Sequence, residues 1–118
     1  MKNIVSVILV VTAVVCSAHG WAEEAAKGAV RTDQKSIQEG KILFGQKCAH
    51  CHDPESKNKI VGPGLKGILK EPLLPVSKKP ATPENVASQM RHPLSNMPSF
   101  IYLSEDEVLN IVGYLNTL

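Results

Sequence analysis

Two thiols and two imidazoles fall within five residues of this chain, in the stretch CAHCH at positions 48–52. A redox-active C-x-x-C pair belongs at the start of a helix that follows a strand, but here the motif follows a predicted helix and no strand pattern precedes it. A structural zinc site needs four ligands, commonly with a second Cys or His pair downstream. Only His92 lies beyond the motif. A third chemistry therefore has to be considered.

C-x-x-C-H is the attachment signature of c-type haem. Each thiol adds across one haem vinyl group, and two intervening residues let the backbone reach both vinyls. The histidine directly after the second cysteine is then brought beneath the iron as an axial ligand. The motif therefore predicts that Cys48 and Cys51 form thioethers to one covalent haem c, and that His52 ligates its iron.

A methionine opposite the histidine is a common sixth ligand, and it raises the reduction potential. Met90 lies on a predicted helix, where a methionine is more often core packing. Met97 lies in a predicted loop and is followed by Pro98. We expect Met97 to be the second iron ligand, with His92 as the alternative.

The first residues resemble a secretory signal peptide. Lys2 is followed by an almost wholly apolar run over residues 4–16 and then by small residues. The run is short for a membrane span, which needs about 20 apolar residues. We predict a signal peptide over 1–22 and a periplasmic location, which suits haem attachment outside the cytoplasm. An uncleaved membrane anchor and lipidation at Cys16 are the alternatives.

The rest of the chain has the pattern of one all-α domain over 36–118, preceded by a loose leader over 23–35. Ser36 with Glu39, and Ser104 with Glu107, have the spacing of capping boxes. Proline and glycine punctuate the long stretches between helices, which predicts ordered loops. The helices are expected over 36–47, 82–91 and 104–116, with a short one within 65–70.

The charges are nearly balanced, with 13 Lys and Arg against 11 Asp and Glu. This balance gives no indication of nucleic-acid binding. The distribution is uneven, because eight lysines fall between residues 41 and 79. A cationic surface beside the haem motif would suit an acidic redox partner.

Three stretches together resemble one family: EGKILFGQKCAHCH at 39–52, VGPGL at 61–65 and MPSFIYLSEDEVLNIVGYL at 97–115. Their order and spacing resemble a class I c-type cytochrome of the short bacterial monohaem type, over about 37–118. The resemblance implies the small cytochrome c fold, with three to four helices and long loops wrapped around one covalent haem.

The resemblance also implies roles for residues outside the haem motif. The Pro63 carbonyl would accept a hydrogen bond from the His52 ring, and Leu65 would pack on the haem face. Many members of the family hold a haem propionate with a tryptophan, but Trp21 lies within the predicted signal peptide. Arg91 is the candidate substitute.

A further implied contact is the crossing of the first and last helices. Gly40 would let the two backbones approach closely, with Phe44 and Tyr114 packed at the contact. A glycine inside a helix costs roughly 1 kcal/mol relative to alanine, and the crossing gives that cost a reason.

The resulting hypothesis is an exported one-electron carrier between a protein donor and a protein acceptor. Because Met97 would close the iron, we predict no catalytic residues and no enzyme activity. The alternatives are a haem subunit of a larger oxidoreductase, and a small haem enzyme such as a peroxidase or a gas-binding protein. The lysines expected nearest the partner are Lys66, Lys70, Lys78 and Lys79.

Overall fold

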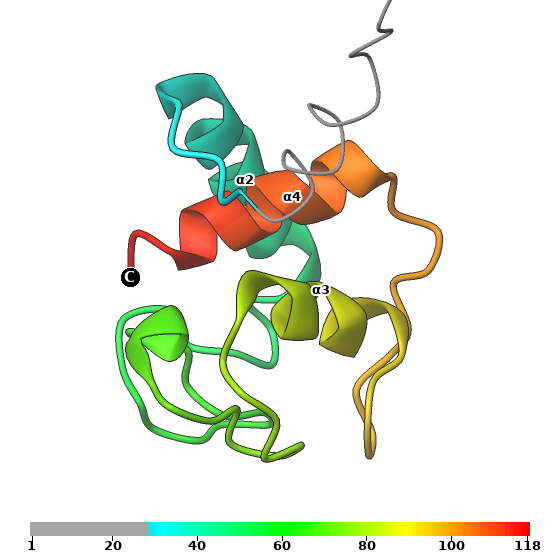
Figure 1. The fold of residues 1–118 in the computed structure, drawn as a ribbon. Helices are drawn as coiled ribbons and strands as arrows, with labels where there is room; N and C mark the ends of the chain where they lie inside the picture. The colour runs from blue at the N-terminus through cyan, green and yellow to red at the C-terminus, as the bar shows by residue number, and fades with distance from the viewer. Residues whose placement is uncertain (1–28) are drawn as a thin grey trace, which may run out of the picture.

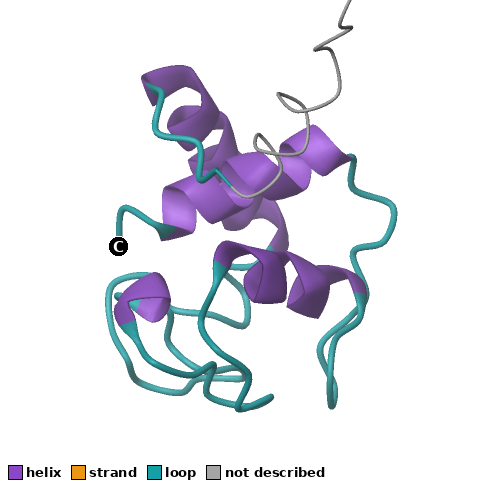
Figure 2. Cartoon of the chain, viewed as in Figure 1, coloured by secondary structure: helices purple, strands orange, loops and turns teal. Residues whose placement is uncertain are grey.

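The computed structural model describes residues 29–118, so the predicted signal peptide at 1–22 and residues 23–28 of the predicted leader lie outside it. Within the described residues the only extended pairing is an isolated bridge between Leu73 and Pro80. The all-α prediction is therefore confirmed (Figures 1 and 2). The elements are α2 (Gln34–Lys47), the 3₁₀ helix η1 (Ile68–Lys70), α3 (Pro83–Arg91) and α4 (Glu105–Leu115).

Helix α2 begins two residues earlier than predicted. Asp33 is its N-cap, and its carboxylate accepts a hydrogen bond from the Ser36 N–H at 2.9 Å. The predicted capping box of Ser36 with Glu39 is therefore wrong. Aspartate is as good an N-cap as serine, and starting at Gln34 adds helical residues. Hydrogen bonds from Ser36 also hold the pKa of Asp33 below its ordinary value.

The predicted caps of the other two helices are confirmed. Thr82 accepts from the Asn85 N–H at 3.2 Å, and Pro83 occupies the first turn of α3, where its missing N–H costs nothing. Ser104 and Glu107 form both bonds of a capping box at the start of α4.

Among the described helices, the most extensive contact is the crossing of α2 over α4 (Figure 1). A Cβ added to Gly40 would lie 1.9 Å from the carbonyl oxygen of Asn110. The Phe44 and Tyr114 rings pack beside it, with centroids 5.4 Å apart and planes tilted by 58°. The implied crossing contact is therefore confirmed, including the reason for glycine.

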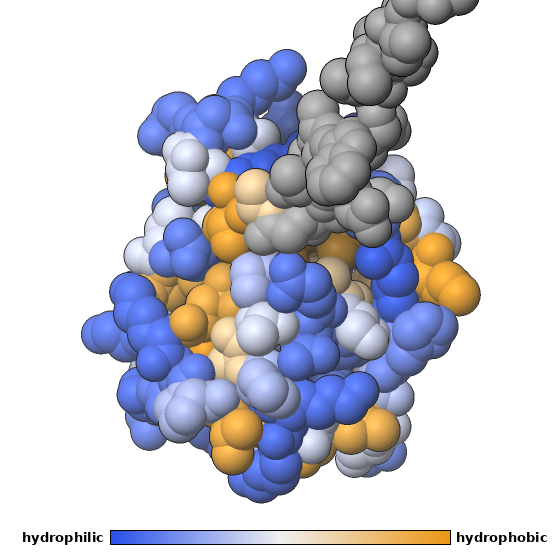
Figure 3. Space-filling model, in the orientation of Figure 1, coloured by the Kyte–Doolittle hydropathy of each residue, from blue (hydrophilic) through white to orange (hydrophobic). Residues whose placement is uncertain are grey.

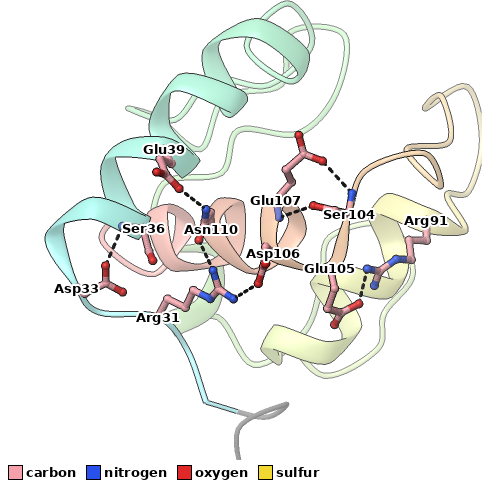
Figure 4. Close-up of polar contacts among 10 residues, drawn as sticks. All are labelled: Arg31, Asp33, Ser36, Glu39, Arg91, Ser104, Glu105, Asp106, Glu107 and Asn110. Atoms are coloured by element: carbon pink, nitrogen blue, oxygen red, sulfur yellow. Dashed lines mark hydrogen bonds and ion pairs between the residues drawn. The ribbon is translucent and has the colours of Figure 1, made fainter.

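The residues just before α2 are fixed on α4. The Arg31 guanidinium donates to the Asn110 side-chain oxygen at 2.7 Å and pairs with Asp106 (Figure 4). Asn110 is only 5% exposed, and its amide donates to Glu39 at 2.9 Å. The backbone of Arg31 crosses Gly113, where an added Cβ would lie 2.8 Å from the Arg31 carbonyl oxygen. Ordered packing therefore begins before residue 36, within the stretch expected to be a loose leader.

Helix α3 packs on α4, and the long loops lie below the helices in the view of Figure 1. Hydrophobic side chains reach the surface in small groups among hydrophilic ones on the face shown in Figure 3. In the part of the chain that the structure describes, every helix is too short or too polar to cross a bilayer.

Gly40→Ala tests the crossing. We expect the free energy of unfolding to fall by about 1–3 kcal/mol, because the new methyl group must push the two helices apart. The matched control is Gly45→Ala in the same helix, where an added Cβ meets nothing within 4 Å. That change should raise stability by up to about 1 kcal/mol through helix propensity. Denaturant unfolding of both variants makes the comparison, and equal effects would contradict the packing account.

Candidate functional site

A cavity of about 440 Å³ lies between the three α-helices and the loops, within the size range of small-molecule sites. Its wall is largely apolar and includes a side chain from each helix: Phe44 of α2, Met90 of α3 and Ile111 of α4. All six site residues predicted from the sequence line this one cavity: Cys48, Cys51, His52, Pro63, Leu65 and Met97.

The two cysteines are free thiols wound into a single turn at the end of α2. The N–H groups of Cys51 and His52 both donate to the Cys48 carbonyl, each at 3.0 Å. Burial, with a smaller contribution from Cys51, raises the pKa of the Cys48 thiol to about 11. The turn places both sulfur-bearing side chains at the wall of the cavity.

The His52 ring is held in a fixed orientation. Its Nδ1–H donates to the Pro63 carbonyl at 2.8 Å, which confirms the implied contact. That bond leaves Nε2 as the ring nitrogen available to a metal. Gly62 is required beside the ring, because an added Cβ would lie 2.5 Å from His52 Cε1. The Gly62 N–H donates to the Cys51 carbonyl at 2.7 Å, so the proline loop is tied directly to the haem motif.

The structure adds supporting residues that the sequence analysis did not identify. The Asp53 carboxylate accepts from the Ser56 hydroxyl at 2.6 Å and the Glu55 N–H at 2.8 Å, and these bonds lower its pKa. Its carbonyl accepts from the Leu65 N–H at 2.8 Å. A Cβ on Gly64 would lie 2.3 Å from the Ser56 carbonyl oxygen. An Asp with Ser three residues later is a turn signal that could have indicated this support.

The two methionines differ as expected. Met90 is 5% exposed within the core, whereas Met97 is partly buried in the loop after α3, and both line the cavity. His92 is exposed and does not line it. Arg91 does not line it either, because its guanidinium bonds the Glu105 carboxylate at 2.6 Å. The expectation that Arg91 replaces a propionate-binding tryptophan is therefore not supported.

The sequence also did not indicate which polar side chains line the cavity wall. Lys47 and Lys59 are its cationic lining residues, and Ser77 and Gln89 contribute neutral polar groups. Lys47 also lies 5.7 Å from the centroid of the exposed Tyr102 ring. Among the described residues no three His, Cys, Asp or Glu side chains gather as a metal site. Two thiols, one oriented imidazole and one thioether around an apolar space fit a haem, not a zinc ion.

The comparisons with known proteins agree with this chemistry. The family described as Cytochrome c matches residues 37–118, which is most of the chain and includes every cavity residue named above. A search of curated proteins gave no match. The matched segment contains the C-x-x-C-H turn, the proline loop, the Met97 loop, α3, α4 and all of α2 except its first residues. The chain therefore belongs to the cytochrome c family of haem-binding electron-transfer proteins.

Proposed function

We propose that this protein is an exported monohaem carrier that moves single electrons between two redox proteins. The observation that carries the proposal is the gathering of Cys48, Cys51, His52 and Met97 on one apolar cavity. The sequence holds one C-x-x-C-H motif, which supports a single covalent haem c. The signal-like residues at 1–22 support export to the periplasm.

Each residue has a role that follows from its position. Cys48 and Cys51 would hold the haem through thioethers, and His52 and Met97 would ligate its iron. The Pro63 carbonyl holds the His52 ring by the 2.8 Å bond and increases the basicity of the coordinating nitrogen. When bound, haem iron supplies the one-electron chemistry by alternating between ferric and ferrous states.

The protein environment favours a carrier over an enzyme. The cavity wall is largely apolar, and Leu65, which lines it, would pack against the haem. As an iron ligand, Met97 would take the coordination position that a peroxidase or gas-binding protein keeps open for its substrate. A haem subunit of a larger oxidoreductase would have the same site, and size-exclusion chromatography of a native extract distinguishes it from a free carrier.

The docking surface lies where exposed lysines meet the cavity. Pro75, Val76 and Ser77 line the cavity at the tip of a turn, and Lys78 and Lys79 follow them on the exposed surface. These two lysines are the best candidates for contact with an acidic partner. A small, mixed apolar and cationic surface suits a transient redox complex, which needs fast arrival and fast release.

The other expected lysines are less well placed. Lys70 donates to the backbone oxygen of the C-terminal Leu118 at 2.7 Å, so its charge is partly engaged. Lys57, which is not one of the four expected lysines, pairs with Glu71. Lys66 is exposed, but it does not line the cavity as Lys47 and Lys59 do.

Met97→Ala tests the ligand assignment. The variant should lose the Met–Fe(III) charge-transfer band, bind cyanide and carbon monoxide, and show a lower reduction potential, because a thioether ligand favours the ferrous state. Met90→Leu is the matched control, a core exchange of similar volume that should cost less than about 1.5 kcal/mol and keep the band. Loss of the band in the Met90 variant instead would show that the assignment is wrong.

The double variant Cys48→Ala/Cys51→Ala tests whether covalent haem completes the fold. Without haem, the largely apolar walls of this cavity would lose the apolar surface that they bury, and burial of apolar surface is the main term that stabilises a small domain. We expect circular dichroism of the exported chain, after removal of any loosely held haem, to show little helix. Cys16→Ala, within the predicted signal peptide, is the control and should have no effect. Native helix content in the double variant would reject the idea.

Reversing the charge of Lys78 and Lys79 tests the docking surface. Second-order electron transfer to an acidic physiological partner should slow in the double glutamate variant, and added salt should slow the wild type as the Debye length shortens to about 10 Å at 0.1 M. Lys35→Glu is the control, because Lys35 lies about 18 Å along α2 from the cavity residue Lys47. Stopped-flow rates that stay constant or rise with ionic strength would rule out lysine steering.

A further inference from the structure

The loop that carries Met97 is closed at its base by two hydrogen bonds to the end of α3. The Phe100 N–H donates to the Met90 carbonyl at 2.9 Å, and the Ser99 hydroxyl donates to the Arg91 carbonyl at 2.7 Å. Both carbonyls belong to the last turn of α3, where a helix leaves them without partners of its own. The chain therefore leaves α3, passes through Met97 and returns to the same helix end.

Between these two points the loop has little polar support. Within the described part of the chain, residues 93–98 neither donate nor accept a hydrogen bond. Ser95 has a φ of 59°, in the left-handed region, and residues 94–96 are exposed. The position of Met97 therefore depends on how firmly the base of the loop is closed.

The base of the loop is in turn fixed to the next helix. The Arg91 guanidinium, whose side chain is 24% exposed, bonds the Glu105 carboxylate at 2.6 Å (Figure 4). Glu105 directly follows Ser104, the N-cap of α4. The end of α3 is thus joined to the start of α4 beside the returning chain.

We propose that Arg91 and Ser99 are positioning residues that hold Met97 at the iron. Ser99 closes the loop onto the Arg91 carbonyl, and the Arg91 side chain fixes that helix end on Glu105. The inference rests on the proposed role of Met97 as an axial ligand. It gives Arg91 a function that differs from the propionate contact expected from the sequence.

Imidazole binding to the ferric protein measures this restraint. Imidazole can reach the iron only after Met97 has left, so its apparent affinity increases in proportion to the open fraction of the loop. We call the Ser99–Arg91 and Arg91–Glu105 hydrogen bonds the clamp. Removing one of them should increase the open fraction of the loop about two- to tenfold, the range that corresponds to the net free energy of one hydrogen bond. A change that only lowers global stability would leave the closed loop, and therefore the affinity, unchanged.

The experiment compares Ser99→Ala and Glu105→Ala with two controls in the holo protein. Asp106→Ala is the control for Glu105→Ala, because each change removes an acidic side chain from the first turn of α4 that pairs with an arginine. The partner of Asp106 is Arg31, which lies before α2 and away from the Met97 loop. Ser99→Thr keeps the hydroxyl. We expect the two clamp variants to bind imidazole about two- to tenfold more tightly, and both controls to stay within about twofold of the wild type.

The alternative outcomes are distinguishable. If Met97→Ala binds imidazole more tightly but Ser99→Ala and Glu105→Ala do not, the clamp is overturned and Met97 remains the ligand. If Asp106→Ala tightens binding as much as Glu105→Ala, general destabilisation explains the effect and the clamp is again overturned. If Met97→Ala itself binds no more tightly than the wild type, the ligand assignment fails and the clamp fails with it.

Discussion

The close crossing of α2 over α4 is the constraint on which the site depends. Gly40 brings the α2 backbone against the Asn110 carbonyl, where an added Cβ would lie only 1.9 Å from the oxygen. The C-terminal end of α2 continues directly into the turn that carries Cys48. Ile111 of α4, the other helix of the crossing, forms part of the cavity wall. The position of the thiols relative to that wall is therefore set by how closely two backbones approach.

The two proposed axial ligands are supported in different ways. His52 lies in a densely bonded region, where the Pro63 carbonyl holds its ring and the Gly62 N–H ties the loop to the haem motif. Met97 lies in a loop that is bonded mainly at its base, through Ser99 and Phe100. Local opening concentrates where hydrogen bonds are few. Because Met97 has fewer supporting hydrogen bonds than His52, we expect Met97 to be the ligand that leaves the iron first.

Local sequence patterns predicted much of this arrangement. The C-x-x-C-H turn, the caps at Thr82 and Ser104 and the glycine crossing each depend on a few neighbouring residues or on a family resemblance. The role of Arg91 could not be predicted in the same way, because its partner Glu105 lies 14 residues away and a helix-end arginine has many possible acids. The same holds for Arg31, whose bond to Asn110 spans 79 positions. Contacts across a tertiary interface have no local signature.

The central claim is that Met97, and not Met90, ligates the haem iron. Its most direct test is the NMR spectrum of the reduced, exported protein with ¹³C-labelled methionine methyl groups. A methyl group on an axial ligand lies close above the haem plane, where the ring current shifts its proton signal strongly upfield. The account predicts that the Met97 methyl has this shift and that the buried Met90 methyl, in the cavity wall, has a far smaller one. Two methionine methyl signals at ordinary positions, or a ligand-like shift of Met90, would contradict it.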